Sequence, residues 1–374
     1  MKATRREFVC GMGCGAAALA LHSCAGPAQA RDGASTADAR TSALRDLLGA
    51  ERERILVTAA RAPSTHNSQP WHVRVIAPDA WVVGGEGSRR LPAVDPADRE
   101  LALSLGAFLE YLATAAAALG FEAQLDDACG AIASDLVRVT LSRAPAGPRG
   151  VEHLDRIARR RTLRKGYSNV PLSPADLGSL GLGPGAHWFP RGTKEADWLA
   201  DAAVQSFQGQ TWRDPAQAEL ARWIRFSTGD ADRAADGLTP ESMEVGGLAG
   251  FYMRHFMDAA SVTGKSFRDA GVDAVRAQAR EGAGWLVLDA PDESTPSLLD
   301  AGRAFARRAL VLRERRLAAH PMSQVLEEEP WRDAIGRSLG LAGRAQLVLR
   351  VGYVDRYPEP VSLRRPVSAF ASIG

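Results

Sequence analysis

The chain has 374 residues but only 4 cysteines, and their positions limit what can hold the fold together. Cys10, Cys14 and Cys24 all lie near the amino terminus, and only Cys129 lies in the body of the chain. One cysteine cannot form an internal disulfide, so the hydrophobic core has to stabilise the fold. The content of 45% hydrophobic and 24% charged residues is ordinary for a globular protein.

The body also lacks several other features that would indicate a class of function. It has no run of apolar residues long enough to cross a bilayer. The 46 basic and 44 acidic residues of the whole chain nearly balance and are scattered, which argues against a nucleic-acid-binding protein. No GxSxG or HExxH motif is present, so neither an acid–base triad nor a metal site is expected. We interpret His66 and His72 as polar loop and strand residues without a role in proton transfer.

Residues 1–30 have the pattern of a twin-arginine signal peptide. The charged start contains Arg5 and Arg6 and is followed by a weakly apolar run. Ala28-Gln29-Ala30 fits a cleavage site, whereas Leu21 to Cys24 resembles a lipobox that would leave Cys24 lipidated. His22 is unusual in a lipobox, so we favour soluble release. The sequence therefore predicts a partner in the twin-arginine export machinery and a periplasmic or extracytoplasmic location, with a lipid anchor at Cys24 as the alternative.

The remaining chain divides into two halves of related pattern. Residues 31–43 are interpreted as a flexible leader, residues 44–143 as the first half and residues 151–374 as the second, with a Pro/Gly-rich linker between the halves. Each half has one long, Ala-rich and therefore buried helix, expected over 99–119 and 297–318, and we expect these two helices to pack together. This weak internal duplication predicts an α+β fold with two lobes.

The other expected elements follow from periodicity and capping residues. The segment of about 210–270 has weak periodicity and is interpreted as an inserted, partly mobile cap. Helices are expected at 44–60, 151–161, 172–180, 193–208 and 331–339, and strands at 72–77, 80–83, 136–142, 285–288 and 346–351.

Three polar segments are candidates for ligand binding. The loop R-A-P-S-T-H-N-S-Q-P-W over 61–71 places small polar side chains and amides between two prolines, which suits contact with a flat polar ring. Residues 159–165 and 362–366 are rich in arginine, whose paired donors suit an anion with several oxygens. The segment A-A-H-P-M-S-Q over 318–324 follows a long helix, and its proline is expected to leave the next backbone donors pointing outward.

Together these segments resemble the FMN-dependent nitroreductase family. The most specific match is A-P-S-T-H-N-S-Q-P-W, supported by R-R-T-L-R over 160–164, by H-P-M-S-Q, and by Q-L-V-L-R-V-G-Y with S-L-R-R near the carboxyl terminus. Residues 95–112 look like the single-chain, Acg-like branch of that family. The resemblance covers most of residues 44–370, apart from roughly 205–280.

The resemblance implies one FMN site assembled from both halves, because each half carries only part of the family's pattern. It further implies an intrachain pseudo-dimer and hence a functional monomer. By resemblance, Arg160, Thr162, Arg164, Arg364 and Arg365 hold the phosphate and ribityl chain. Pro63, Ser64, Asn67 and Gln69 contact the ring, and Pro321, Met322, Ser323 and Gln324 face the ring near its reactive nitrogen.

The activity implied is a hydride or electron relay through FMN to a small organic acceptor, in which the flavin itself carries the chemistry. An exported protein meets no nicotinamide pool, so the sequence does not predict the identity of the electron donor. The inserted segment is also long enough to cover the flavin. An FMN-sequestering or storage protein without turnover is therefore the alternative, and an exported module that binds a different anion is a third.

Overall fold

The computed structural model describes residues 36–127, 132, 135–147 and 149–374. The signal expected over 1–30, with Cys24 and Ala30, lies outside the described residues, and so does Cys129. Helix α1 spans Thr36–Ala59, so helix begins within the expected leader and before Leu44. Gly49 interrupts it with a φ of 68° and a ψ of 166°. From Ala39 onward the chain forms one compact unit, and the following description concerns that unit.

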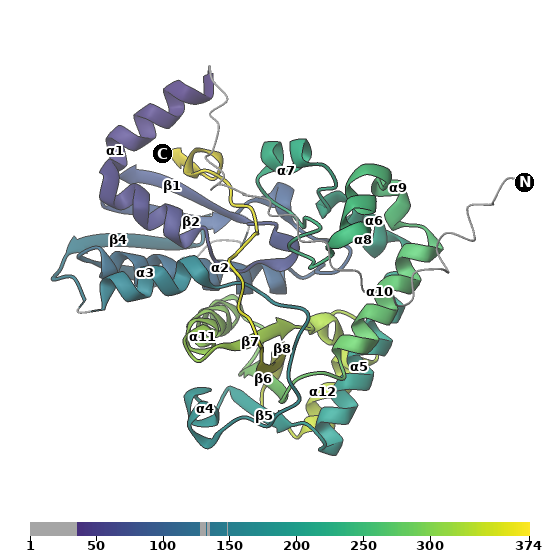
Figure 1. The fold of residues 1–374 in the computed structure, drawn as a ribbon. Coiled ribbons are helices and arrows are strands. Elements are labelled where there is room, and N and C mark those ends of the chain that lie inside the picture. The colour runs from purple at the N-terminus through teal and green to yellow at the C-terminus, as the bar shows by residue number, and fades with distance from the viewer. Residues whose placement is uncertain (1–35, 128–131, 133–134, 148) are drawn as a thin grey trace, which may run out of the picture. The chain divides into compact units, whose positions relative to one another are not determined.

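The two halves contain sheets of the same topology (Figure 1). In the first, β1 and β2 precede helix α2, and β3 and β4 follow it, giving the order β3-β4-β2-β1. In the second, β5 and β6 precede helix α11, and β7 and β8 follow it, giving the order β7-β8-β6-β5. All these neighbours are antiparallel. The two-lobed α+β fold is therefore confirmed, and the duplication is one of topology.

The structure contains the strands that were predicted where the sequence alternation is clear, together with strands that were not predicted. The sequence missed β3, β5, β7 and β9. The bounds are β1 Trp71–Ala77, β2 Ala80–Gly85, β3 Phe121–Asp127, β4 Val137–Arg143, β5 Ala186–Pro190, β6 Gly284–Ala290, β7 Leu317–Pro321, β8 Arg344–Tyr353 and β9 Ala371–Ile373.

Helices α2 (Arg99–Ala118) and α11 (Thr295–Glu314) pack directly on one another, as expected. A Cβ placed on Gly106 would lie 2.1 Å from the carbonyl oxygen of Leu299, and one on Gly302 would lie 2.1 Å from the carbonyl oxygen of Leu103. Each leucine precedes its own helix's glycine by three positions, so the two contacts are reciprocal. Such reciprocity is the signature of a twofold crossing, here within one chain.

The carboxyl terminus crosses from the second half to the first. β9 pairs in parallel with β1, and the Val73 amide donates to the Phe370 carbonyl oxygen at 2.8 Å. The Phe370 ring meets Phe108 edge to face at 6.1 Å, and Phe108 stacks on Trp71 at 5.0 Å. Figure 1 shows this yellow segment running from β8 to a place beside β1. The crossing fixes residues 362–366 next to the loop of the first half.

The segment of about 210–270, interpreted from the sequence as an inserted, partly mobile cap, consists of a succession of short helices. Their ends are set locally, for example by Ser227 and Asp258, whose side chains accept from backbone amides of the first turn. The remaining helices are α3 Gly150–Arg159, α4 Pro174–Ser179, α5 Lys194–Trp212, α6 Asp214–Trp223, α7 Thr228–Ala234, α8 Gly247–Phe256, α9 Ala259–Val262, α10 Lys265–Gln278 and α12 Trp331–Leu339.

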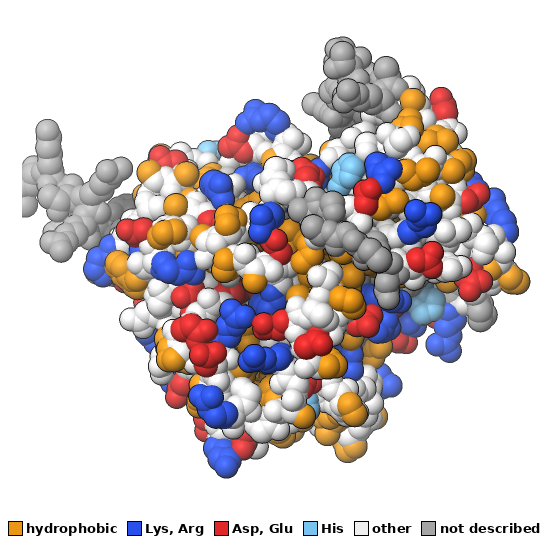
Figure 2. All heavy atoms as spheres, turned by 180° about the vertical axis from the view of Figure 1, so that it is seen from behind, with side chains coloured by type: hydrophobic (Ala, Val, Ile, Leu, Met, Phe, Trp, Pro, Cys, Tyr) orange, Lys and Arg blue, Asp and Glu red, His pale blue; other side chains and the backbone are white. Residues whose placement is uncertain are grey.

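Helix α2 is long and apolar enough to cross a bilayer by length and composition alone, contrary to the expectation that the body has no such run. Since 78% of its apolar window is buried within the chain, α2 serves as a core helix in this fold. The charged side chains seen in Figure 2 are of both signs and interspersed, which agrees with the scattered basic residues of the sequence.

Candidate functional site

The loop between α1 and β1 has an unusual backbone. His66, Asn67 and Gln69 adopt positive φ angles of 52°, 53° and 50°. Non-glycine residues seldom adopt this conformation, and groups of them concentrate at functional sites where the surrounding structure enforces them. The Ser64 hydroxyl supports the turn by accepting a hydrogen bond from the Gln69 backbone amide at 3.0 Å. The loop is therefore strained and fixed.

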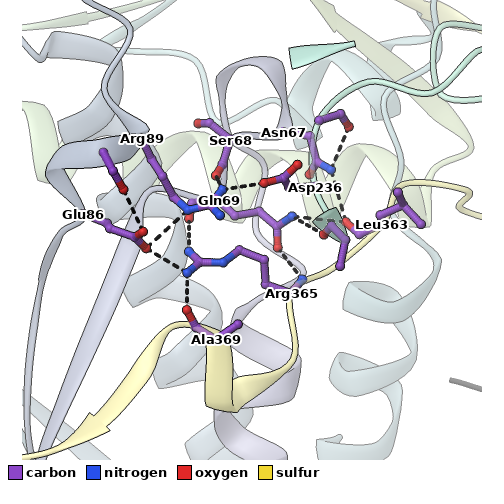
Figure 3. A network of polar contacts seen from close by, with 12 residues as sticks. Asn67, Ser68, Gln69, Glu86, Arg89, Asp236, Leu363, Arg365 and Ala369 are labelled. Carbon is purple, nitrogen blue, oxygen red and sulfur yellow. Dashed lines mark hydrogen bonds and ion pairs between the residues drawn. The ribbon is translucent and has the colours of Figure 1, made fainter. Parts of the chain in front are cut away.

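The two amide side chains of this loop hold other segments in place. The Asn67 amide donates to the carbonyl oxygens of Gly237 and Leu363 at 3.1 Å each. The Gln69 amide donates to the Ala235 carbonyl oxygen at 2.9 Å and accepts from the Arg365 backbone at 2.8 Å. Figure 3 shows Gln69 between the tail and the inserted helices. Asn67 and Gln69 thus join three segments, and their polar groups are engaged within the chain.

An ion-pair network surrounds the same loop. Arg365 contacts Glu86 at 2.8 Å and donates to the Gln69 carbonyl oxygen at 3.1 Å. Arg89 donates to the Ser68 carbonyl oxygen at 2.8 Å and to Asp236 at 2.7 Å (Figure 3). These contacts hold Arg365, and with it the tail, against the loop.

Three arginines gather at the other end of the loop, where Arg364 also donates to the Asn67 side-chain oxygen at 2.8 Å. The Arg61 carbonyl oxygen accepts from Arg160 at 3.5 Å and from Arg364 at 3.2 Å. The Nε groups of Arg160 and Arg364 are buried and have no hydrogen-bond partner among the described residues. Burial, and then the charges of Arg160 and Arg61, lower the pKa of Arg364 to about 9. Such crowding of like charge is unfavourable unless an anion compensates it.

The rest of the arginine segment contacts the insertion. The Arg164 backbone amide donates to Glu244 at 2.8 Å, and its guanidinium donates to the Ser242 carbonyl oxygen at 2.5 Å. Arg161, which the sequence analysis did not single out, pairs with Glu244 at 3.5 Å. Thr162 lies between them, half-buried. Arg160 therefore lies at the arginine cluster, while Arg164 is bound to the inserted segment.

The segment Pro321–Gln324 lies at the end of β7 and the start of a short 3-10 helix, Ser323–Leu326. The Met322 amide donates to the Val348 carbonyl oxygen at 2.8 Å, so it is not the outward-pointing donor that was expected. The Ser323 hydroxyl accepts from the Val348 amide at 3.3 Å, and the Gln324 side chain donates to the Ala203 carbonyl oxygen at 3.1 Å. Met322 itself is buried in the core of the second half.

A group of carboxyl side chains joins this segment to the loop. The Thr65 hydroxyl donates to Glu100 at 2.6 Å, and Arg99 contacts Glu100 at 2.9 Å. Gln210 donates to Glu327 at 2.5 Å. Burial, and then the charge of Glu100, raise the pKa of Glu327 well above its usual range. The same two causes raise the pKa of Asp95 to about 6.

His66 lies beside this group. Burial lowers its pKa to about 4, against the opposing effect of Glu100, so the imidazole is neutral at pH 7. Its Nε2 atom is buried without a hydrogen-bond partner among the described residues. The loop, the arginine segment, the tail and the 321–327 segment therefore meet at one place, although they are far apart in the sequence.

Comparisons with known proteins agree with the resemblance found in the sequence. No protein-family model matches the chain. It is 27% identical over 328 residues, covering 84% of this chain and 89% of the relative, to Putative NAD(P)H nitroreductase Rv3131 of Mycobacterium tuberculosis. It is also 27% identical, over 79% of this chain and 86% of the relative, to Probable NAD(P)H nitroreductase PigM of a Serratia species. These relatives support a nitroreductase-type chain.

Among solved structures, the FMN-dependent nitroreductase NfnB from Mycobacterium smegmatis aligns at 15% identity with a TM-score of 0.31. The alignment covers 55% of this chain and 92% of that one. A likeness this weak carries no argument about the ligands of this chain.

The sequence pointed to the segments of the site more successfully than to the role of each residue. The structure brings Arg160, Arg364 and the Pro63–Gln69 loop together. It engages Asn67, Gln69, Arg164, Arg365 and Met322 in contacts within the chain.

Sequence reasoning missed Arg61, Glu100 and Glu327. Glu100 lies in the first turn of a helix, where an acidic residue is common, and Glu327 begins an acidic run, so neither position gave a signal of burial.

Proposed function

We propose that this chain is an exported FMN-binding oxidoreductase of nitroreductase type, which relays hydride or electrons to a small organic acceptor. The observation that carries the proposal is the arginine cluster. Arg160 and Arg364 keep buried Nε donors that have no partner among residues 36–127, 132, 135–147 and 149–374, and their charges repel one another. A phosphate group bound between them would supply the missing acceptors and the compensating charge. The names of the relatives, putative NAD(P)H nitroreductases, support the same class of activity.

The residues of the site fit FMN at the phosphate end. When bound, FMN would supply the electron-transfer chemistry, and the chain would bind it, orient it and exclude water. Arg160, Arg364 and Arg61 would hold the phosphate. Asn67 and Gln69 would act by holding the strained loop in place, because their amides are already engaged. Pro63, Ser64 and the 321–324 segment would then border the ring.

An alternative with a specific observation in its favour is a protein that sequesters FMN without turnover. The insertion supplies the Ala235 and Gly237 carbonyl oxygens to the loop, and its Asp236 pairs with Arg89 and with Arg225 at 2.5 Å. Amide hydrogen bonds from Asn67 and Gln69, and the ion pair of Asp236 with Arg89, which also donates to the Ser68 carbonyl oxygen, therefore hold the insertion against the loop. If these contacts between the insertion and the loop persist when flavin is bound, an external acceptor would not reach the flavin ring.

The decisive experiment is a visible absorbance spectrum of residues 31–374 purified after cytoplasmic expression. A flavin spectrum near one FMN per chain supports the single site and the functional monomer. A colourless protein that FMN does not reconstitute would contradict flavin binding and leave a different anion as the ligand. Chemical reduction followed by addition of a nitroaromatic then separates the two functions, since rapid reoxidation by the nitroaromatic requires an accessible ring.

Export is tested separately. The full chain and its Arg5→Lys, Arg6→Lys double variant would be fractionated, and retention of only the variant in the cytoplasm would support the twin-arginine signal. Equal retention of both would contradict it. Release of the exported protein into the soluble fraction would favour cleavage at Ala30 over lipidation of Cys24.

A further inference from the structure

We propose that Arg350 is a positioning residue, which sets the spacing between the two segments that would hold the opposite ends of FMN. This inference rests on the proposed function. The first segment is the arginine-rich stretch 159–165, at the phosphate end, and the second is Pro321–Gln324, at the ring. Arg350 lies in β8, and its side chain is completely buried. A side chain without exposed surface cannot contact a ligand, so Arg350 acts through the residues that it holds.

One end of the Arg350 guanidinium joins the two segments. Its Nη2 atom donates to the backbone carbonyl oxygen of Arg164 at 2.8 Å and lies 3.3 Å from Nδ1 of His320. Because arginine has donors but no acceptor, Nδ1 of His320 is the acceptor of this second contact. Arg164 belongs to the arginine-rich stretch, and His320 immediately precedes Pro321. A single nitrogen atom therefore holds the two segments at a fixed spacing.

The other contacts of Arg350 fix the orientation of its guanidinium. The Nη1 atom donates to the Gln278 carbonyl oxygen at the end of α10, and it contacts the Glu281 carboxylate at 3.3 Å. The face of the guanidinium lies 4.0 Å from the centre of the Tyr167 ring. The Tyr167 hydroxyl in turn donates to the Leu163 carbonyl oxygen at 2.8 Å, which gives a second hold on the arginine-rich stretch. The planar group is thus held at both ends and on one face, as a lysine ammonium would not be.

The spacing matters because a ligand with a phosphate at one end and a ring at the other would engage both segments at once. Simultaneous engagement is worth about 10²–10⁴ in affinity over either end alone, and this gain is lost when the two sites do not fit the span of the ligand. Each segment also has contacts that do not involve Arg350. The Arg164 amide donates to Glu244, and the Met322 amide donates to the Val348 carbonyl oxygen. Loss of Arg350 should therefore change the spacing of the segments while each still binds its own end of the ligand.

The test compares three ligands: FMN, riboflavin, which has the ring but no phosphate, and inorganic phosphate. Flavin fluorescence measures the affinity for the first two, and titration calorimetry that for the third. In Arg350→Met we expect the affinity for FMN to fall by about 10-fold or more, while those for riboflavin and phosphate stay close to the wild type. Arg350→Lys keeps the charge but not the two-ended contacts, so it should show the same selective loss, and it serves if Arg350→Met does not fold. Arg344→Lys, at the exposed start of the same strand, is the matched control and should change none of the three.

The three affinities separate positioning from a general loss of structure. An equal fall for FMN, riboflavin and phosphate would mean that Arg350 only stabilises the fold, and would overturn the positioning role. Unchanged affinity for FMN in a folded Arg350 variant would also overturn it, and both results would leave the proposed function standing. A wild-type chain that binds no FMN would instead refute the proposed function, and this inference with it.

Discussion

Replacement of Gly106 by alanine tests the crossing of α2 and α11 on which the two-lobed fold depends. The added Cβ would lie 2.1 Å from the Leu299 carbonyl oxygen and 2.9 Å from its carbon. Ordinary contacts begin near 3.4 Å, so the helices have to separate by about 1.3 Å, the difference between these distances. Both atoms belong to helix backbone, which cannot turn aside as a side chain can.

The expected cost follows from that separation. Overpacking a core costs about 1–3 kcal/mol, and widening a packed contact by 1 Å forfeits roughly a quarter to a half of its dispersion energy. Alanine gains about 1 kcal/mol over glycine in a helix interior. We therefore expect Gly106→Ala to lower the free energy of unfolding by about 2 kcal/mol net, and Gly302→Ala to do so by a similar amount because its contact is reciprocal.

Urea unfolding followed by circular dichroism measures the effect. Gly336→Ala is the matched control, since Gly336 also lies in a helix and an added Cβ there meets nothing within 4 Å. This control should be neutral or slightly stabilising. The double variant should cost less than the sum of the single ones, because one separation of the helices relieves both clashes. Equal behaviour of Gly106→Ala and Gly336→Ala would refute the close crossing.

Three further predictions concern the site. Arg160→Gln and Arg364→Gln should each weaken FMN binding by 10-fold or more in titration calorimetry, at about 1.5–3 kcal/mol per charge-assisted bond, whereas exposed Arg337→Gln should not. Asp236→Ala removes the ion pairs of Asp236 with Arg89 and Arg225 and should speed reoxidation of reduced flavin by an external acceptor; Asp230→Ala, which loses an exposed pair with Arg233 and a hydrogen bond from Ser227, all within the insertion, should leave the rate unchanged. Burial and Glu100 raise the Asp95 pKa from 3.8 to about 6, so its stabilising contribution is present below pH 3.8 and is lost as pH rises through 6. Between pH 4 and 7, the free energy of unfolding of Asp95→Asn, measured from urea midpoints, should therefore rise relative to that of the wild type by up to about 3 kcal/mol. A difference that does not change with pH would contradict the raised pKa of Asp95.

Helices with strong local signals were predictable from the sequence. α12 spans Trp331–Leu339 as expected, and α5 begins after Thr193, whose hydroxyl accepts from the Ala196 amide. α4 follows Ser173 and starts with Pro174, the pattern of a capped first turn. These elements are specified by residues within a few positions of one another. Their starts could therefore be read without knowing what they pack against, whereas α5 continues to Trp212, beyond the expected end at 208.

Strands that depend on distant partners were not predictable in the same way. β7 has the sequence L-A-A-H-P, with no β-branched residue and no alternation, and exists because β8 pairs with it. β9 has only three residues and pairs in parallel with β1, almost 300 positions away. The buried state of Glu100 has the same origin, since Thr65, 35 positions away in the sequence, and Glu327, from the second half, contribute to its environment.

The site contains two kinds of polar group, which differ in whether contacts within the chain satisfy their hydrogen bonds and charge. The amides of Asn67 and Gln69 are fully engaged, so they stabilise the strained loop whether or not a ligand is present. The Arg61, Arg160 and Arg364 cluster carries crowded positive charge, and the Nε donors of Arg160 and Arg364 have no partner in the part of the chain that the structure describes, so the cluster destabilises the chain until an anion binds. A ligand that binds only the folded chain stabilises it by mass action, by about 2.7 kcal/mol at 100 times its dissociation constant. An anion at this cluster also removes the repulsion among the arginines. Thermal stability should therefore rise with added FMN in the wild type and much less in Arg160→Gln or Arg364→Gln, and an equal rise in all three would place the anion elsewhere.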